Sequence, residues 1–213
     1  MNKILVSPSI LSADFSKLDL ESLSLQQCGA DWVHCDVMDG KFVNNTTFNH
    51  ETVAKIRKAV DIVVDVHLMI ETPELFVDDY IDAGADFVTF HLEACKDSAS
   101  LIKHIKDRGV KCGISIKPNT PVESVFPYLD DVDMVLIMSV EPGWGGQKFL
   151  PSALPKLATL REKCPQLILQ VDGGINLENV QSVIDAGANS IVSGSTVFKS
   201  DDRASIISAL RGK

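Results

Sequence analysis

Two histidines and two aspartates of this chain stand near the ends of short apolar runs, where they could together hold a metal ion. One run contains His34 and Asp36, and a second contains His67. A third run ends at Asp172. Because side chains alternate across an extended chain, His34 and Asp36 would share one face of their strand. Two imidazoles with two carboxylates suit a single divalent ion of the zinc, iron(II), manganese or cobalt type.

Glycine-rich turns follow three apolar runs in the last third of the chain. Backbone N–H groups exposed at such turns and at helix starts bind phosphate without needing Lys or Arg side chains. Three such turns meeting at one end of a fold would therefore form a phosphate site. The residues concerned are Gly143, Gly145, Gly146, Gly173, Gly174, Gly194 and Ser195.

Eight β-rich apolar runs could position these groups. They are continuous rather than alternating, which is typical of parallel strands buried on both faces. We expect strands over Ile4–Ser9, Trp32–Val37, Ile62–Met69, Phe87–His91, Val110–Ile116, Met134–Val140, Leu167–Val171 and Ser190–Ser193.

An amphipathic stretch follows each run, so strand and helix alternate along the whole chain. This alternation predicts a parallel α/β fold. We expect helices over Phe15–Gln27, Glu51–Ala59, Pro73–Ala83, Ser98–Asp107, Val122–Leu129, Ala153–Lys163, Leu177–Ala186 and Arg203–Leu210.

Similar glycine turns recur at Gly29, Gly84 and Gly187, each between a helix and the next strand. Their spacing is close to whole multiples of about 27 residues, the length of one strand–helix unit in an eight-unit barrel. We therefore predict one (β/α)8 TIM barrel of the phosphate-binding type as a single domain over residues 1–213. A doubly wound open sheet is disfavoured, because Gly-x-Gly-x-x-Gly is missing after the first strand.

Composition excludes several classes of protein. The chain is 45% apolar and carries a formal net charge of −9, so we expect neither nucleic-acid nor membrane partners. No apolar run approaches the roughly 20 residues of a membrane-spanning helix, and the first residues do not read as a signal peptide. Five widely spaced cysteines read as reduced thiols, which favours a cytoplasmic location.

A metal on one side and a phosphate site on the other predict a small phosphorylated substrate rich in oxygen. Asp36 and Asp172 would come from different strands and could lie on opposite faces of a flat intermediate. That arrangement suits epimerisation, in which a proton leaves one face of a carbon beside a carbonyl and another arrives on the other face. The reaction needs no organic cofactor.

At these motifs the sequence resembles the ribulose-phosphate 3-epimerase family. The matching segments span nearly the whole chain: Ser7–Asp14, His34–Val43, Asp65–Met69, Val140–Gln147, Val171–Ile175 and Gly194–Ser195. The resemblance implies a metal-dependent barrel that interconverts D-ribulose 5-phosphate and D-xylulose 5-phosphate in the pentose phosphate pathway. It also implies a homo-oligomer, either a dimer or a hexamer.

The resemblance also implies roles for individual residues. Asp36 and Asp172 would be the acid/base pair, and the metal ligands would be His34, Asp36, His67 and Asp172. Ser9 and His67 would contact substrate, as would a larger group formed by Met38, Met69, Met138, Gly143, Trp144, Gly145, Gly146, Asp172, Gly173, Gly174, Gly194 and Ser195. The methionines would pack around the reacting carbon, and the glycines with Ser195 would hold substrate and phosphate.

The sequence allows two roles each for Asp65 and His91. Asp65 could orient a metal-bound imidazole, but we interpret it as a structural carboxylate lower in the barrel. His91 could reach the pocket or serve the structure. The loop Asn44–His50 departs from the family pattern, with Asn44 and Asn49 where Pro and Gly are usual, and Trp144 replaces the usual Phe.

Three other functions are possible for a barrel with such motifs. A 3-epimerase for a related ketose phosphate, such as allulose 6-phosphate, would share these motifs. A lyase of the orotidine-decarboxylase and hexulose-phosphate-synthase type would need Asp-x-Lys-x-x-Asp at the third strand, which here reads Asp65-Val66-His67-Leu68-Met69. A non-catalytic metabolite-binding barrel is disfavoured by the intact set of metal ligands and carboxylates.

Overall fold

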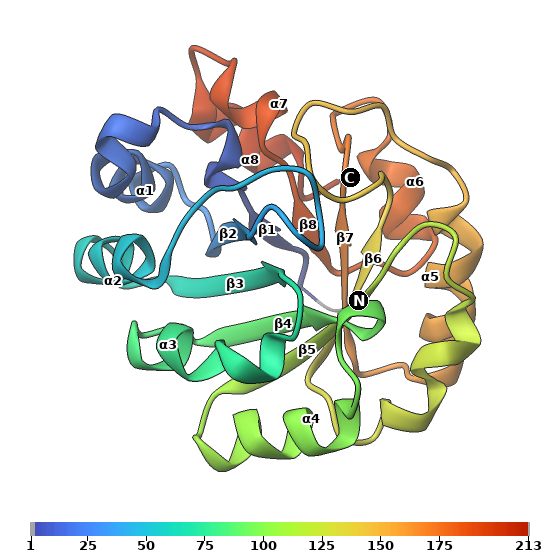
Figure 1. Ribbon diagram of the computed structural model, residues 1–213. Helices are drawn as coiled ribbons and strands as arrows, with labels where there is room; N and C mark the ends of the chain where they lie inside the picture. The colour runs from blue at the N-terminus through green and yellow to red at the C-terminus, as the bar shows by residue number, and fades with distance from the viewer. Residues whose placement is uncertain (1–2, 213) are drawn as a thin grey trace.

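Parallel strands curl into a barrel in the computed structural model, which describes residues 3–212 (Figure 1). The hydrogen-bonded order is β1-β8-β7-β6-β5-β4-β3-β2. The strands are β1 (Leu5–Ser7), β2 (Trp32–Met38), β3 (Val63–Met69), β4 (Phe87–His91), β5 (Lys111–Ile116), β6 (Met134–Met138), β7 (Ile168–Asp172) and β8 (Ser190–Val192). The predicted (β/α)8 architecture is confirmed.

β1 and β2 are the two end strands of this order, and individual hydrogen bonds close the seam between them. Ser9 forms an isolated parallel bridge with His34. The His34 amide donates to the Pro8 carbonyl at 3.1 Å, and the Asp31 amide donates to the Val6 carbonyl at 3.0 Å. These bonds complete the ring and bring the residues after β1 beside the carboxyl end of β2.

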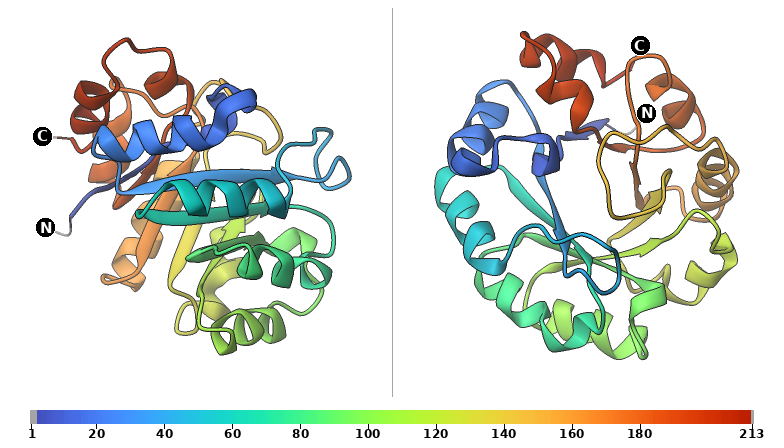
Figure 2. Two further views of the ribbon diagram at one scale, coloured as in Figure 1. Left: turned by 90° about the vertical axis from the view of Figure 1, so that its left-hand side faces the viewer. Right: turned by 45° about the horizontal axis from the view of Figure 1, so that its top comes forward.

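Helices surround the barrel (Figure 2). They are α1 (Leu18–Gln27), α2 (His50–Ala59), α3 (Val77–Asp82), α4 (Ser98–Asp107), α5 (Ala153–Lys163), α6 (Val180–Asp185), α7 (Ser195–Phe198) and α8 (Arg203–Ala209). The short helix α7, directly after β8, was not expected from the sequence.

One expected helix has a different form. The stretch predicted as a helix over Val122–Leu129 is the 3₁₀ helix η5 (Val122–Tyr128), which contains Pro127. Proline lacks an N–H and clashes with the preceding turn, so an α-helix is disfavoured there. Other 3₁₀ turns are η1 (Ile10–Ser12), η2 (Phe15–Lys17), η3 (Pro73–Leu75) and η4 (Leu92–Ala94).

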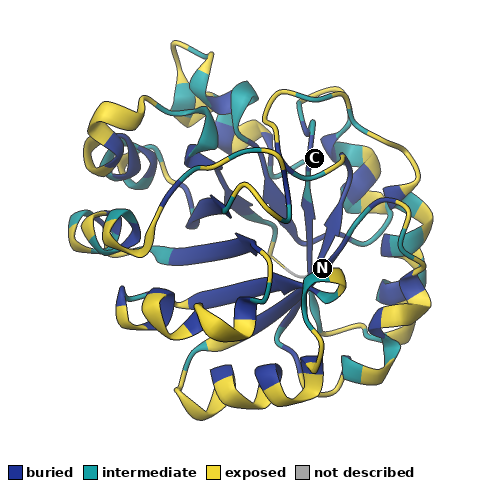
Figure 3. Cartoon of the chain, viewed as in Figure 1, coloured by how far each residue is buried: buried dark blue, intermediate teal, exposed yellow. Residues whose placement is uncertain are grey.

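The strands are buried on both faces (Figure 3). In β2, Val33, Cys35 and Val37 belong to the large apolar core. Trp32 belongs to a separate cluster with Phe87 and Met134, and its ring stacks on Phe87 with centroids 4.8 Å apart. Large apolar side chains therefore fill one end of the barrel, and polar side chains of the same strands lie toward the other end.

Within residues 3–212 there is no helix with the length and hydropathy needed to cross a membrane. The five cysteines are free thiols.

Asp31 joins three parts of the chain at the amino ends of the strands. Its carboxylate accepts from the Val6 amide at 2.9 Å and from Arg211 at 2.5 Å, and it pairs with Lys3 at 2.7 Å. Burial opposes ionisation of Asp31, but the bonds from Lys3, Val6 and Arg211 outweigh it and lower the pKa of the carboxyl group. The start of β1 and the end of the chain are thereby held to the β1–β2 seam.

We expect Asp31→Ala to lower the free energy of unfolding by about 2 kcal/mol at pH 7, because buried donors lose their acceptor. Asp107→Ala is the control, since Asp107 forms an exposed pair with Lys103 and its loss should cost at most about 0.5 kcal/mol. Urea denaturation measures both values.

The loss of unfolding free energy caused by Asp31→Ala should depend on pH in a defined direction. A lowered pKa in the folded state makes the Asp31 contribution complete above the unfolded value near 3.8 and removes it as pH falls further. The gap between the parent protein and Asp31→Ala should therefore narrow below about pH 3.8. Equal destabilisation by the two alanine variants at pH 7 would contradict this account of the seam.

Candidate active site

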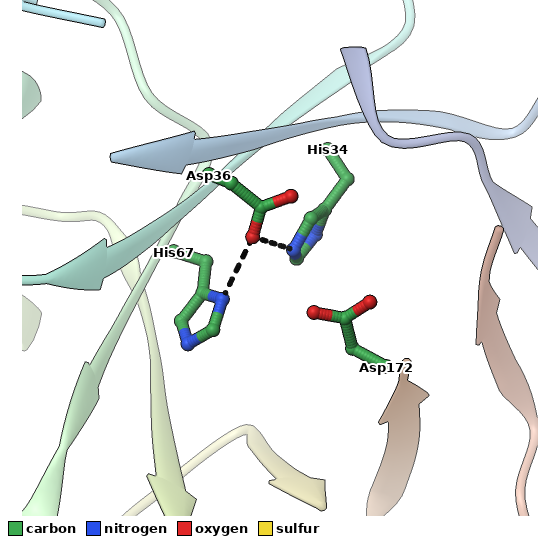
Figure 4. A group of neighbouring side chains, drawn as sticks. All are labelled: His34, Asp36, His67 and Asp172. Carbon is green, nitrogen blue, oxygen red and sulfur yellow. Dashed lines mark hydrogen bonds and ion pairs between the residues drawn. The ribbon is translucent and has the colours of Figure 1, made fainter. Parts of the chain in front are cut away.

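Four side chains predicted as ligands meet at the carboxyl ends of three strands. His34 and Asp36 extend from β2, His67 from β3 and Asp172 from β7. One potential ligand atom from each residue lies within 4.8 Å of the corresponding atoms of the other three. Figure 4 shows Asp36 beside both imidazoles, with the Asp172 carboxylate pointing toward them from β7.

The register of the sheet explains this convergence. Asp36 is directly opposite His67 in the β2–β3 ladder, and Met138 is opposite Asp172 in the β6–β7 ladder. Parallel strands in a barrel all end at the same rim, so residues at their ends face one cavity. The positions of these residues at strand ends are therefore enough to predict from the sequence that their side chains lie close together.

His34 presents a ring nitrogen suited to a cation. Its Nδ1 lies 2.7 Å from an oxygen of Asp65, which also accepts from Gln170 at 2.8 Å. A carboxylate only accepts, so the Nδ1 atom of His34 carries a proton. The other nitrogen, Nε2, is buried without a hydrogen-bond partner, 3.3 Å from Asp36 Oδ1. Asp65 thus lies against His34 and orients it, unlike the purely structural interpretation made from sequence.

The electrostatics of the cluster favour positive charge. Burial opposes protonation of His34, but the carboxylates of Asp36 and Asp65 outweigh it and raise the pKa of the imidazole well above its usual value. A place that stabilises a proton in this way also attracts a divalent cation. The two-nitrogen, two-oxygen donor set fits a borderline ion such as zinc.

The two aspartates differ in their affinity for protons. Burial opposes ionisation of Asp36, but the adjacent His34 outweighs it and lowers the pKa of Asp36. Burial and then the charge of Asp36 raise the pKa of Asp172 to about 7. Carboxylates whose pKa values are driven apart are suited to act as acid and base.

Ser9 anchors the second oxygen of Asp36. Its hydroxyl donates to Asp36 Oδ2 at 2.5 Å, and its Oγ accepts from the Leu11 amide at 3.2 Å. The closed seam between β1 and β2 brings these residues together. Asp36 is therefore held on one side by Ser9 and lies on the other side beside His34 and His67.

One cavity extends from the carboxylates to the glycine turns. The residues expected from sequence that line it are Ser9, Asp36, Met38, Met69, Met138, Gly143, Trp144, Gly145, Gly146, Asp172, Gly173, Gly174, Gly194 and Ser195. His34 and His67 are fully buried and are not among its lining residues. Sequence analysis missed Ser12, Glu141 and Gln147, which also line it.

Gln147 could have been found from the glycine-rich segment that contains it. Its amide donates to the carbonyls of Glu141 at 2.6 Å and Trp144 at 2.9 Å. Those bonds hold together the part of the β6–α5 loop that lines the cavity. Ser12 gave no signal, because only the close approach of the segments after β1 and β8 brings it to the site.

Two of the glycines are required by close contacts between turns. Gly174 has φ +67°, and a Cβ there would lie 2.5 Å from the amide nitrogen of Phe149. A Cβ on Gly194 would lie 2.6 Å from Ser12 Oγ. The turn at Gly174 can therefore approach the backbone of Phe149 only without a side chain, whereas a side chain at Gly194 would have to displace the Ser12 hydroxyl.

The unusual loop after β2 keeps the site intact. Asn49 caps α2 by accepting from the Thr52 amide at 3.0 Å, and its φ of −96° does not require glycine. Asn45 donates to the Gly143 carbonyl at 3.0 Å and so joins this loop to the loop after β6. Asn45 thus joins the two loops, and Asn49 serves as the N-cap of α2.

We expect Gly174→Ala to destabilise the fold by about 3 kcal/mol and to disturb the cavity, because the new methyl group meets backbone that cannot yield. Gly109→Ala is the matched control. Gly109 has φ +79°, but its Cβ would meet nothing within 4 Å. Gly109→Ala should therefore lower the free energy of unfolding only by the backbone strain, about 1 kcal/mol. Thermal unfolding compares the two, and equal losses would contradict the packing argument.

Comparison with known proteins agrees with this geometry. A model of the Ribulose-phosphate 3 epimerase family matches residues 5–198. The ribulose-phosphate 3-epimerase of Bacillus subtilis is 45% identical over 214 residues, covering 98% of this chain and 99% of that protein. The enzyme of that name from Eremothecium gossypii is 45% identical over 222 residues, covering 99% of this chain and 93% of that protein.

A solved structure of 3-hexulose-6-phosphate synthase matches with a TM-score of 0.69 at 19% identity. The match covers 99% of this chain and 98% of that one, and it shows a shared fold.

Proposed function

The chain belongs to the ribulose-phosphate 3-epimerase family, and from that premise we propose that it interconverts D-ribulose 5-phosphate and D-xylulose 5-phosphate. The observation that carries the proposal is the pair Asp36 and Asp172, which line one cavity from opposite parts of the barrel rim. The pathway served is the pentose phosphate pathway.

The proposed chemistry is a two-base proton transfer at carbon 3. The carbonyl at carbon 2 acidifies the carbon 3 proton, so one carboxylate removes it and leaves an enediolate. The other carboxylate, in its protonated form, then delivers a proton to the opposite face. The opposite pKa shifts of Asp36 and Asp172 support this division, since one is driven toward the ionised form and the other toward the protonated form.

We propose that His34, Asp36, His67 and Asp172 hold one divalent ion. The support is the unpartnered Nε2 of buried His34 and the mixed nitrogen and oxygen donor set. Such an ion would stabilise the negative charge that develops on the substrate oxygens. Zinc, iron(II), manganese and cobalt all suit these donors, and no organic cofactor is needed.

The remaining residues of the cavity would bind and orient the sugar phosphate. Backbone amides at Gly145, Gly146, Gly174, Gly194 and Ser195 would hold the phosphate, in keeping with the turn at Gly174, which lies too close to the Phe149 backbone to admit a side chain. Met38, Met69 and Met138 line the cavity beside the carboxylates and would exclude water around the reacting carbon.

We further propose that the protein acts in the cytoplasm as a homo-oligomer, either a dimer or a hexamer. Its five free thiols suit a reducing compartment. Sedimentation of the purified protein tests the oligomeric state.

The first test is metal content. We expect His34→Ala to lose most bound metal by elemental analysis while keeping its far-UV circular dichroism, because the vacant ligand position weakens the site. His104→Ala is the control, since His104 is exposed and pairs with Asp78 on the surface. Full turnover of ribulose 5-phosphate after chelator treatment and verified metal loss would refute metal dependence.

The second test separates base loss from metal loss. Asn keeps one oxygen for the ion but accepts no proton, so Asp36→Asn and Asp172→Asn should each lower turnover by about 10²–10⁴-fold. Metal content is measured on the same preparations. An Asp172→Asn variant with full metal and undiminished turnover would remove Asp172 from the mechanism. Parallel assays with allulose 6-phosphate decide between the pentose and hexulose substrates.

A further inference from the structure

The turn that follows β5 bends around one lysine ammonium. Residues 117–120, called the β5 turn below, are closed by a hydrogen bond from the Thr120 amide to the Lys117 carbonyl at 3.1 Å. The side chain of Lys156 reaches this turn from α5. Its Nζ donates to the carbonyls of Lys117 at 3.1 Å, Pro118 at 2.7 Å and Thr120 at 2.6 Å. Three backbone oxygens therefore converge on one nitrogen.

The nitrogen of Lys156 is held as a cation. An ammonium group has three hydrogens for three acceptors, whereas a neutral amine would turn its lone pair toward one of the carbonyl oxygens. The side chain is half-buried. Burial lowers the pKa of Lys156, and the carboxylates of Glu93 and Glu123 act against that shift. Backbone carbonyls that replace a lost hydration shell are also what proteins use to bind potassium ions.

The opposite side of the β5 turn faces a carboxylate. Glu93, which follows β4, accepts at Oε1 from the Lys117 amide at 2.8 Å and from the Thr120 hydroxyl. The N–H side of the turn thus meets a negative charge, and the carbonyl side meets the positive charge of Lys156. Because each charge lies where the peptide dipoles favour it, the two side chains together hold the turn in one conformation.

Three loops at the carboxyl rim of the barrel contact the β5 turn. Asn119 donates to Oε1 of Glu141 at 3.4 Å, and Glu141 lines the cavity of the candidate active site. The Lys117 ammonium lies 3.9 Å from the centre of the Phe42 ring, which belongs to the loop after β2. Glu93 belongs to the loop after β4. The turn therefore joins the loops that follow β2, β4 and β6.

We propose that the carbonyls of the β5 turn form a monovalent-cation site, which Lys156 fills with its own ammonium, and that this tethered cation positions the rim of the cavity. Lys156 is a positioning residue, because its ammonium contacts the turn and is not among the groups that line the cavity. The part of the inference that concerns catalysis rests on the proposed function. If the lysine side chain were removed, a potassium ion would occupy the same three oxygens.

Lys156→Ala tests this by removing the tethered cation. We expect turnover of ribulose 5-phosphate to fall about 10–100-fold, because the loops joined by the β5 turn move away from the reactive geometry. Potassium chloride or ammonium chloride should restore most of the turnover. Either salt should also raise the variant's midpoint of thermal unfolding, because a ligand that binds only the folded state stabilises it. Tetramethylammonium chloride at equal ionic strength should do neither, because its cation is too large for the turn.

Lys103→Ala is the matched control for loss of a lysine side chain. Lys103 lies on α4 and forms an exposed pair with Asp107, 2.5 Å away. Both the turnover and the thermal unfolding of this variant should be independent of potassium, as they should be for the parent protein. Parental turnover by Lys156→Ala without potassium or ammonium would overturn the proposal. A loss of turnover that neither cation reverses would also overturn it.

A measurement on the parent protein decides the cation site even if Lys156→Ala fails to fold. ¹H–¹⁵N spectra of lysine ammonium groups report how fast their hydrogens exchange with water. Because three carbonyls hold the hydrogens of Lys156, they should exchange much more slowly than those of Lys103. Equally fast exchange would overturn the proposal. A parent protein that does not turn over ribulose 5-phosphate would instead contradict the proposed function, and the exchange and unfolding measurements would still decide the cation site.

Discussion

The site depends on holding two carboxylates, the buried Asp36 and the half-buried Asp172, close to one another at the mouth of a barrel. Ionising both Asp36 and Asp172 without compensation would cost several kcal/mol. Two features relieve that cost: His34 beside Asp36 attracts positive charge, and the raised pKa of Asp172 leaves it substantially protonated near neutral pH. In our account a divalent ion replaces the protons that the cluster otherwise gathers. Metal binding and proton transfer then use the same residues for one electrostatic reason.

The arrangement arises because the two ends of the strands carry different kinds of side chain. Trp32, Phe87 and Met134 form an apolar cluster at one end of the barrel. Toward the other end, inward positions carry histidines and carboxylates, and late turns carry glycines. Because every second side chain of a β-strand points to the same face, one strand can place both apolar and polar residues along its inward face. The packed end stabilises the barrel, and the polar end can keep buried charges that would destabilise an isolated sheet.

Much of this could be predicted from the sequence, because it depends on strand order and strand ends. The four proposed ligands and the glycine turns were placed in this way, and the cavity brings the turns to the carboxylates. The features that could not be predicted are contacts between side chains far apart in the sequence. Ser12 reaches Gly194 only through the seam of the barrel. Glu93 lies 3.2 Å from His91, whose ring in turn lies 3.0 Å from His67. The stretch Val122–Leu129 has a helical pattern, but Pro127 within it disfavours an α-helix and leaves the 3₁₀ helix η5.

The most direct test of the two-carboxylate account follows hydrogen at carbon 3 in heavy water. Ribulose 5-phosphate is converted at low extent, and both xylulose 5-phosphate and the remaining substrate are examined by NMR. If one carboxylate removes a proton and the other delivers a solvent-derived one, deuterium appears at carbon 3 of the product while remaining substrate stays unlabelled. Product without deuterium, or substrate labelled as fast as product forms, would contradict proton transfer between two carboxylates on opposite faces.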